Sequence, residues 1–471
     1  MGLSPPNPAA TLTVCAAILL ISCPSAQSKC KFKAIFNFGD SNSDTGGFWA
    51  AFPAQTGPYG MTFFKNPAGR ASDGRLLIDF IAQALGLPFL SPYLQSLGSD
   101  YRHGANFATL ASTVLLPNTS LFVTGISPFS LAIQINQMKA FKASVDELHR
   151  KPVKGSTMLP RPSILRKSLF TFNIGQNDFT SNLAAIGIDG VKHFLPQVVS
   201  QIAGSIQEVY GLGGRAFLVQ NLAPIGCFPA FLEELPHVDS DVDGFGCMES
   251  YNRAVEEYNG MLREALRRSR QALPGASVIY VDTYSVFLQL FRRPGRHGLV
   301  HGTRACCGRG GGAHNFDRRV VCGKWRVIDG RNYTAEACGD PQRYVSWDGI
   351  HATEAANRAV AAAILDGSAF EPPFPLSHPG RHGLVHGTRA CCGRGGGAHN
   401  FDRRVVCGKW RVIDGRNYTA EACGDPQRYV SWDGIHATEA ANRAVAAAIL
   451  DGSAFEPPFP LSHLCRLRSL A

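Results

Sequence analysis

The chain has 471 residues, of which 45% are hydrophobic and 17% are charged. This composition is typical of a folded globular protein with a large core, and it excludes an intrinsically disordered chain. The net charge is +10, but the basic residues are spread thinly and form no stripe interleaved with aromatic residues, so we expect no nucleic-acid partner.

Residues 1–28 have the features of a secretory signal peptide. A short apolar run at Leu12–Ile21 precedes small residues, Ser25, Ala26 and Ser28, that suit a signal peptidase, although no Lys or Arg comes before the run. The run is too short to span a bilayer and no later run is long enough, so stable membrane insertion is not expected. The alternative interpretation is a buried N-terminal helix.

Two further features favour secretion. Of the 14 cysteines, 12 remain when Cys15 and Cys23 leave with the signal peptide (14 − 2 = 12), and this number suits an oxidising compartment. Sequons for N-glycosylation begin at Asn118, Asn332 and Asn417.

The strand and helix patterns alternate along the chain, which favours a mostly parallel sheet covered by helices on both faces. The expected strands are Lys33–Phe38, Leu169–Asn173, Ala216–Gln220 and Val278–Asp282. The expected helices are Leu76–Leu85, Leu131–Leu148, Val198–Tyr210, a long amphipathic helix containing Tyr251, Val255, Tyr258 and Leu262, and Ala355–Leu365.

An exact repeat occupies the C-terminal part of the chain. Residues 294–378 recur without a change as residues 379–463, an offset of 85, and residues 464–471 form a tail. Perfect identity is unlike the divergent repeats of solenoid proteins, and it indicates a recent duplication or an error in the gene model. We therefore expect one domain over residues 29–378, followed by a spare copy of its last part.

Polar segments recur where we expect strands to end, and α/β folds bind their ligands at that edge of the sheet. The four segments are Gly39-Asp40-Ser41, Gly104 to Ala108, Asn173 to Asp178, and Trp347-Asp348-Gly349-Ile350-His351. Singly, each is ordinary turn or cap chemistry, and we interpret Asp40, Asn42, Ser43 and Asp44 as groups that hydrogen-bond within a turn. Jointly, they supply the nucleophile, the base, the orienting acid and the oxyanion donors that acyl transfer needs.

In this order the four segments resemble the plant branch of the GDSL esterase/lipase family, within the SGNH hydrolase superfamily. The resemblance runs from about Lys33 to His378 and includes Asn221–Cys227 and Ala305–Gly308, although Asn42 stands where the family usually has leucine. It implies a three-layer α/β/α flavodoxin-like fold with a central parallel sheet, and ester hydrolysis without a cofactor. It also implies a location in the apoplast or cell wall, with retention in the vacuole or endomembrane system as the alternative.

The resemblance further implies a role for each site residue. Ser41 would be the nucleophile, His351 the general base and Asp348 the group that orients the base. The backbone N–H groups of Ser41 and Gly104, with the side-chain amide of Asn177, would form the oxyanion hole. The substrate would be an ester of a small molecule, a lipid or an acetylated glycan.

The repeat offers a second acid and base, Asp433 and His436, with flanks identical to those of Asp348 and His351. Using them requires looping out about 85 residues, at a cost of a few kcal/mol at most. Locality and order of synthesis favour the first pair. We expect a monomer, with a risk of swapping or aggregation through the spare copy, whose helix has no sheet to cover.

The cysteines of the repeat favour disulfides over a metal site. The adjacent Cys306 and Cys307 cannot readily bond to each other, so one or both should reach Cys322 or Cys338. Cys227 and Cys247 are close enough in sequence to form another bridge. The duplicate cysteines are Cys391, Cys392, Cys407 and Cys423. Zinc is the alternative, but the chain has no Cys-x-x-Cys, and we expect no metal.

Three functional hypotheses follow. The first is a secreted serine-dependent ester hydrolase. The second is an acyltransferase that passes the same acyl group to an alcohol. The third is a catalytically silent secreted protein that the duplication misassembles.

Overall fold

The computed structural model describes residues 32–117, 126–150 and 158–365, and within the second copy of the repeat residues 386–393, 410–413, 416–423 and 429–431. The predictions for residues 1–28, Asn118, Asp433, His436 and the tail 464–471 lie outside the described residues. Among the described helices, none is long and apolar enough to cross a membrane.

In the described part of the chain, a five-stranded parallel sheet forms the centre of the molecule, in the order β2-β1-β3-β4-β5. The strands are β1 (Ala34–Gly39), β2 (Gly104–Asn106), β3 (Ser168–Asn173), β4 (Ala216–Gln220) and β5 (Ser277–Val281). Their residues are almost all buried, as expected for a parallel sheet with both faces covered.

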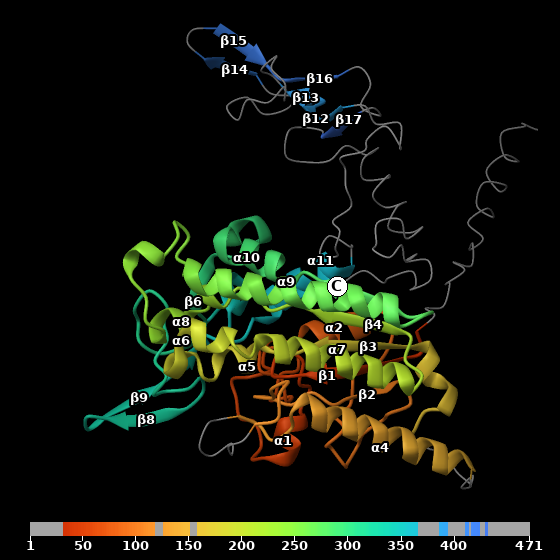
Figure 1. Ribbon diagram of the computed structural model, residues 1–471. Coiled ribbons are helices and arrows are strands. Elements are labelled where there is room, and N and C mark those ends of the chain that lie inside the picture. Colours follow the sequence, from red (N-terminus) through yellow and green to blue (C-terminus); the bar gives the residue numbers. More distant parts are fainter. Residues whose placement is uncertain are drawn as a thin grey trace, which may run out of the picture.

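Helices cover the sheet on both sides (Figure 1). On one side α4 (Leu131–Arg150) packs against α7 (Leu195–Gly211), which packs against α9 (Glu249–Ala272). On the other, α11 (Glu354–Leu365) packs against both α2 (Leu77–Ala84) and α10 (Thr283–Arg292). The shorter helices are α1 (Gly47–Ala51), α5 (Gln176–Thr180), α6 (Leu183–Lys192) and α8 (Pro229–Glu234). The predicted three-layer α/β/α fold is confirmed.

The amphipathic pattern explains the longest of these helices. In α9, Tyr251, Val255, Tyr258 and Leu262 recur at intervals of three and four residues, and all four are buried. The predicted strands and helices match the observed ones to within a few residues at most ends. The short strand β2 and the helix α10 were not predicted.

A buried polar network joins the three strands nearest the candidate site. The Asn37 amide in β1 donates to Asn106 Oδ1 in β2 (2.7 Å), and Thr171 Oγ1 in β3 donates to Asn37 Oδ1 (2.7 Å). Asn106 Nδ2 donates in turn to the carbonyl of Ser43 (2.7 Å). The network therefore fixes the turn after β1 to the sheet beneath it.

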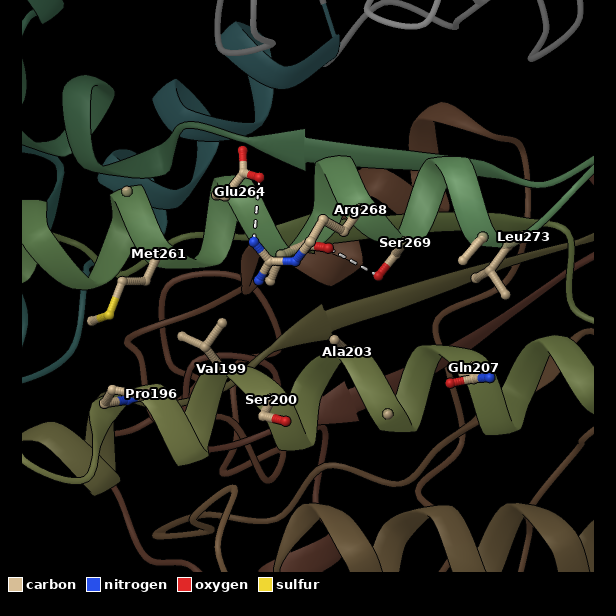
Figure 2. Close-up of a pocket in the computed structure, with 14 residues that line it drawn as sticks. Pro196, Val199, Ser200, Ala203, Gln207, Met261, Glu264, Arg268, Ser269 and Leu273 are labelled. Atoms are coloured by element: carbon tan, nitrogen blue, oxygen red, sulfur yellow. Dashed lines mark hydrogen bonds and ion pairs between the residues drawn. The ribbon is translucent and has the colours of Figure 1, made fainter.

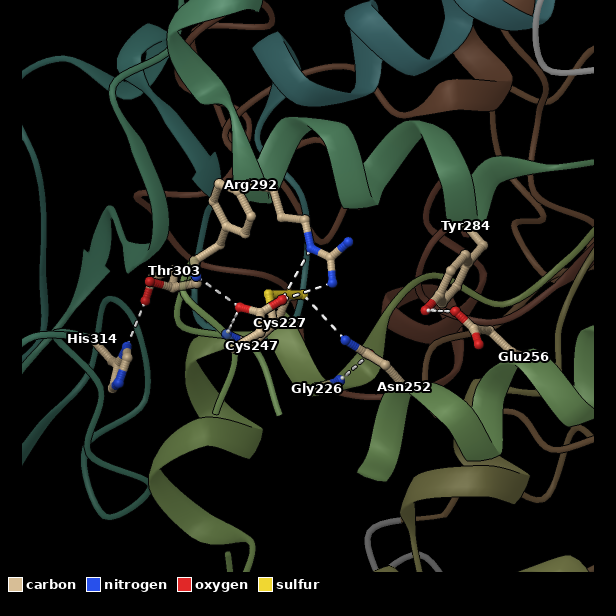
Figure 3. The surroundings of a disulfide bond; sticks show 11 residues. Gly226, Cys227, Cys247, Asn252, Glu256, Tyr284, Arg292, Thr303 and His314 are labelled. Atoms are coloured by element: carbon tan, nitrogen blue, oxygen red, sulfur yellow. Dashed lines mark hydrogen bonds and ion pairs between the residues drawn. A yellow bond between two sulfur atoms is a disulfide. The ribbon is translucent and has the colours of Figure 1, made fainter. Parts of the chain in front are cut away.

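Disulfides cross-link the segment between α10 and α11. The bridges Cys306–Cys338 and Cys307–Cys322 hold three short strand pairs, and Cys227–Cys247 lies nearby, beside Asn252 and the Arg292–Asp243 ion pair (Figure 3). The predicted pairings are confirmed. The strand pairs are β6 (His301–Ala305) with β11 (Tyr344–Ser346), β7 (Cys307–Gly308) with β10 (Glu336–Ala337), and β8 (Trp325–Ile328) with β9 (Arg331–Thr334).

The second copy of the repeat forms the same strand pairs again. Its bridge Cys391–Cys423 repeats Cys306–Cys338. The pairs are β12 (His386–Ala390) with β17 (Tyr429–Ser431), β13 (Cys392–Gly393) with β16 (Glu421–Ala422), and β14 (Trp410–Ile413) with β15 (Arg416–Thr419). In the described residues of the second copy, the strand pairs and this bridge therefore form within the copy itself.

The polar network should be essential for stability. Replacing Asn106 by Leu leaves the buried Ala108 N–H without its acceptor, and it leaves the Asn37 amide and the Ser43 carbonyl only their 3.3 Å bond to each other. We therefore expect the free energy of unfolding in urea to fall by about 2–3 kcal/mol. The control is Asn66→Leu at an exposed turn, which should change it by no more than about 0.5 kcal/mol. Equal effects of the two substitutions would contradict this account.

Candidate active site

The turn that carries Ser41 begins where β1 ends. The side-chain amide of Gln134, on α4, accepts from the Gly39 N–H (2.9 Å) and donates to the Gly39 carbonyl (2.8 Å). A Cβ on Gly39 would lie 2.6 Å from the backbone carbonyl oxygen of Asn173, so only glycine fits there. Asp40 Oδ1 then accepts from the backbone and side-chain nitrogens of Asn42, both at 2.9 Å. These contacts fix the backbone on both sides of Ser41.

Ser41 lies within hydrogen-bond distance of a histidine that is 310 residues later in the chain. Its Oγ is 2.8 Å from His351 Nε2, and His351 Nδ1 is 2.8 Å from Asp348 Oδ2. Asp348 Oδ1 also accepts from the backbone N–H groups of Ile350 (3.1 Å) and His351 (2.9 Å). The structure thus brings together Ser41, His351 and Asp348, with both carboxylate oxygens bonded within one turn.

The turn from Asp348 to His351 has a compact internal structure. The N–H of Trp347 donates to the carbonyl of His351 (2.7 Å), and Trp347 itself is buried. Gly349 has φ +99°, and a Cβ there would lie 2.4 Å from the ring of Phe316. The Asp-Gly-Ile-His sequence therefore suits a turn that needs a glycine at its second position.

Residues 72–75 hold the chain immediately after His351. The Ser72 hydroxyl donates to the Ala352 carbonyl (3.0 Å), and Asp73 Oδ1 accepts from the Glu354 N–H (2.7 Å). Arg75 forms a buried ion pair with Glu354 (2.9 Å). Breaking one partner of a buried pair is strongly destabilising. The start of α11, and with it the imidazole, is therefore held in place by contacts to the segment before α2.

Tyr59 is a third residue that hydrogen-bonds to Asp348, after Ile350 and His351. The Tyr59 hydroxyl donates to Asp348 Oδ2 (3.0 Å), the same oxygen that faces the imidazole, and the Tyr59 ring lies edge-on to Trp347. Nothing in the sequence indicated this contact, because Tyr59 and Asp348 are 289 residues apart.

Asp348 and His351 are both buried, and each shifts the pKa of the other. Burial alone would raise the pKa of Asp348, but the charge of His351 and the hydrogen bonds outweigh it and hold that pKa below its usual value of 3.8. Burial alone would lower the pKa of His351, but the Asp348 carboxylate outweighs it and raises that pKa above 6.5. The arrangement therefore favours a carboxylate beside an imidazole that accepts protons readily.

Asn177 lies on α5, which follows β3, the neighbour of β1. Its Nδ2 donates to the Ser112 carbonyl (2.8 Å), which leaves the second amide hydrogen for another acceptor. The adjacent Gln176 contacts Asn42 (3.4 Å) beside Ser41. Asn177 is thus placed at the C-terminal edge of the sheet, on the same side as Ser41.

Gly104 does not belong to this site, and its predicted place in the oxyanion hole was wrong. Gly104 begins β2 and pairs with Ile35, four residues before Gly39, so it lies roughly 13 Å down the strand at 3.3 Å per residue. Its N–H donates to the carbonyl of Tyr101 (3.0 Å). The error arose because we took the segment at Gly104 to follow a strand, whereas it starts one.

The loop after β2 does reach the C-terminal edge of the sheet, and buried acids hold it there. Asp178 accepts from the N–H groups of Val114 (2.7 Å) and Leu115 (3.0 Å), and Asp44 accepts from that of Leu110 (2.8 Å). Burial raises the pKa of Asp178 to about 7 and that of Asp44 to about 6. These carboxylates shape the site without contacting the imidazole.

Ala111 in this loop was missed by the sequence reasoning. It has φ +62°, a left-handed conformation that costs a non-glycine residue roughly 1–2 kcal/mol. It precedes Ser112, whose carbonyl binds Asn177, and its own N–H has no acceptor among the described residues. A strained backbone position next to a site is a signal that only a structure can give.

Other candidate sites are weaker. Over the described ranges, no three His, Cys, Asp or Glu side chains are grouped so that they could hold a metal ion. A groove lies between α7 and α9, where Val199, Ala203, Met261 and Leu273 are among the lining residues (Figure 2). Its polar residues include Glu264, whose partners are Arg267 and Arg268. None of the residues around Ser41 lines this groove between α7 and α9.

A serine bonded to an imidazole, which is bonded to a carboxylate at the edge of a parallel α/β sheet, is the arrangement that defines serine hydrolases. Comparison with known proteins specifies the class further. The model of the GDSL-like lipase/acylhydrolase family matches residues 35–364. The chain belongs to this family, within the SGNH superfamily, and is a carboxylic ester hydrolase.

Two plant proteins illustrate the similarity. The GDSL esterase/lipase At4g01130 of Arabidopsis thaliana is 62% identical over 361 residues, covering 77% of this chain and 94% of that protein. An esterase of Hevea brasiliensis is 40% identical, covering 79% and 94%. Among solved structures, a catalytic mutant of Axe2, an acetylxylan esterase from Geobacillus stearothermophilus, matches with 13% identity and a TM-score of 0.31, covering 72% and 95%. That likeness is too loose to inform function.

The electrostatics of the site predict the pH profile. Because the pKa of His351 is raised, kcat/KM should fall as the pH decreases through a midpoint above 6.5. Tyr59→Phe removes one donor from Asp348, so the carboxylate should stabilise the imidazolium more and move the midpoint to higher pH. The same substitution removes a contact that holds Asp348 in its orientation, and because such a hydrogen bond is worth about 0.5–1.5 kcal/mol, turnover at the pH optimum should fall about two- to tenfold.

The control is Tyr210→Phe, whose hydroxyl donates to Pro274 on the surface. It should leave both the midpoint and the turnover unchanged. A midpoint that moves to lower pH in Tyr59→Phe would contradict the assigned contact.

Proposed function

We propose that the protein hydrolyses carboxylic esters through an acyl-enzyme on Ser41. His351 takes the hydroxyl proton as Ser41 attacks the ester carbonyl, and then returns it to the leaving alcohol. Asp348 keeps the imidazole in the tautomer that accepts at Nε2 and stabilises the cation. A water molecule, activated by the same imidazole, releases the acid. The observation that carries this proposal is the continuous pair of 2.8 Å contacts from Ser41 through His351 to Asp348.

The oxyanion hole that we propose contains a different set of hydrogen-bond donors from the predicted one. The Ser41 N–H and the second amide hydrogen of Asn177 are retained. The N–H of Ala111 replaces that of Gly104, supported by its unpaired state among the described residues and its position next to Ser112. An oxyanion donor typically contributes about a hundredfold or more to turnover.

We also propose that the enzyme is secreted after removal of residues 1–28. The disulfides, and the exposure of Asn332 and Asn417 within their sequons, support an oxidising and glycosylating compartment. The hydrolase domain would cover residues 29–378. Residues 379–463 would be an appendage that keeps its own strand pairs and supplies no group to the site.

The duplicated histidines provide a matched test. We expect His351→Ala to lower the rate of p-nitrophenyl acetate hydrolysis by about a thousandfold or more, because the general base is lost. His436→Ala has the same substitution in the same local sequence, 85 residues later, and should stay within about twofold of the parent.

The other possible results of this test each support a different hypothesis. Loss of activity only in His436→Ala would mean that the second copy supplies the base. Inactivity of the parent, in a monodisperse preparation, would support the silent protein. Product analysis with an added alcohol separates hydrolysis from acyl transfer, because a new ester appears only if the alcohol intercepts the acyl-enzyme.

A further inference from the structure

The hairpin of β8 and β9 projects from the body of the molecule (Figure 1). Its two-residue loop, Asp329-Gly330, has φ values of 49° and 74°, as in the turns that join tightly paired strands. The paired positions are Trp325 with Thr334, Arg326 with Tyr333, Val327 with Asn332, and Ile328 with Arg331. Residues opposite each other in an antiparallel pair share a face, so this register assigns every side chain of the hairpin to one of two faces.

One face turns toward the protein. The guanidinium of Arg309 lies over the ring of Tyr333, 3.1 Å from its centroid, and Arg326 Nη1 donates to the carbonyl of Arg319 (3.5 Å). Ile328, on the same face, is half-buried. The register therefore directs the other face toward solvent.

The outer face carries two large apolar side chains. Trp325 is 70% exposed and Val327 is 52% exposed. Asn332 and Thr334, the first and third residues of the sequon Asn332-Tyr333-Thr334, are on the same face and are also exposed. Asn332 is directly opposite Val327 and diagonal to Trp325, and diagonal neighbours are within reach of an aromatic side chain.

We propose that Asn332 carries an N-linked glycan whose first N-acetylglucosamine packs on Trp325 and Val327. The sugar offers an apolar C–H face with partial positive charge, and the indole ring offers an electron-rich face that attracts it. The glycan thereby covers an exposed apolar patch that would otherwise favour association between chains. This inference rests on the proposed secretion, since only a chain in the secretory pathway meets the glycosylation machinery.

The second copy, whose sequence is identical, has the same register. Trp410 pairs with Thr419, and Val412 pairs with Asn417. Val412 is 53% exposed, and Asn417 is exposed as well. The hairpin of β14 and β15 therefore has the same sequon opposite the same valine, and the glycan site occurs twice.

Because the two hairpins have identical sequences, proteolytic peptides from them have the same mass. The test therefore uses a parent with Asn417→Gln and Trp410→Phe, secreted from insect cells, so that only the first hairpin is observed. The glycan is trimmed to a single N-acetylglucosamine. Mass spectrometry then measures the occupancy of Asn332 and the rate at which hydroxyl radicals oxidise Trp325. The comparison protein also carries Asn332→Gln, and the half-buried Trp49 is the internal reference.

We expect Asn332 to be occupied and Trp325 to be oxidised about twofold more slowly when the sugar is present, because a stacked sugar covers one of the two ring faces. Oxidation of Trp49 should not change. Enzymatic removal of the whole glycan from the folded protein should restore the faster rate. An unoccupied Asn332 in a secreted, active protein would overturn the inference, and so would an occupied Asn332 with unchanged oxidation of Trp325. Failure of secretion would instead overturn the proposed location, and with it this site.

Discussion

The contact between Ser41 Oγ and His351 Nε2 is the constraint on which the rest of the structure depends. It joins the turn after the first strand to the turn before the last helix, across 310 residues. The sheet fixes one end, through Gln134 and the network of Asn37. The Arg75–Glu354 pair fixes the other end from within α11. Because both ends are held by buried groups, the serine and the imidazole are positioned before any substrate arrives, which is what fast acyl transfer requires.

The same constraint bears on the duplication. The position that α11 fills, against α2 and α10 and beside Arg75, accommodates one helix, and Glu354 of the first copy occupies it. The second copy could enter only by displacing the first. Its strand pairs and its Cys391–Cys423 bridge form within the copy itself. These local contacts support the proposal that the second copy is an appendage that leaves the catalytic edge of the sheet undisturbed.

Local patterns predicted most of the fold and part of the site. The helix α9 was evident from periodicity and the strands β3 and β4 from their local sequence patterns, whereas the resemblance to the GDSL family assigned Asp348 and His351 their roles. Gly104 was misplaced because β2 has only three residues and no apolar run to mark where it begins. Ala111 and Tyr59 could not be predicted, because their importance lies in a strained backbone angle and in a contact across 289 residues. Such features depend on tertiary geometry and leave no periodic signal.

Covalent trapping tests the central claim most directly. A fluorophosphonate reacts fastest with a serine whose proton is removed as it attacks, so the intact mass of the inhibited protein and the peptide that carries the adduct identify the nucleophile. Our account predicts one adduct per chain, located on Ser41, forming at a rate that falls as His351 becomes protonated. An adduct on another residue, or undiminished ester hydrolysis by a protein fully modified at Ser41, would contradict it.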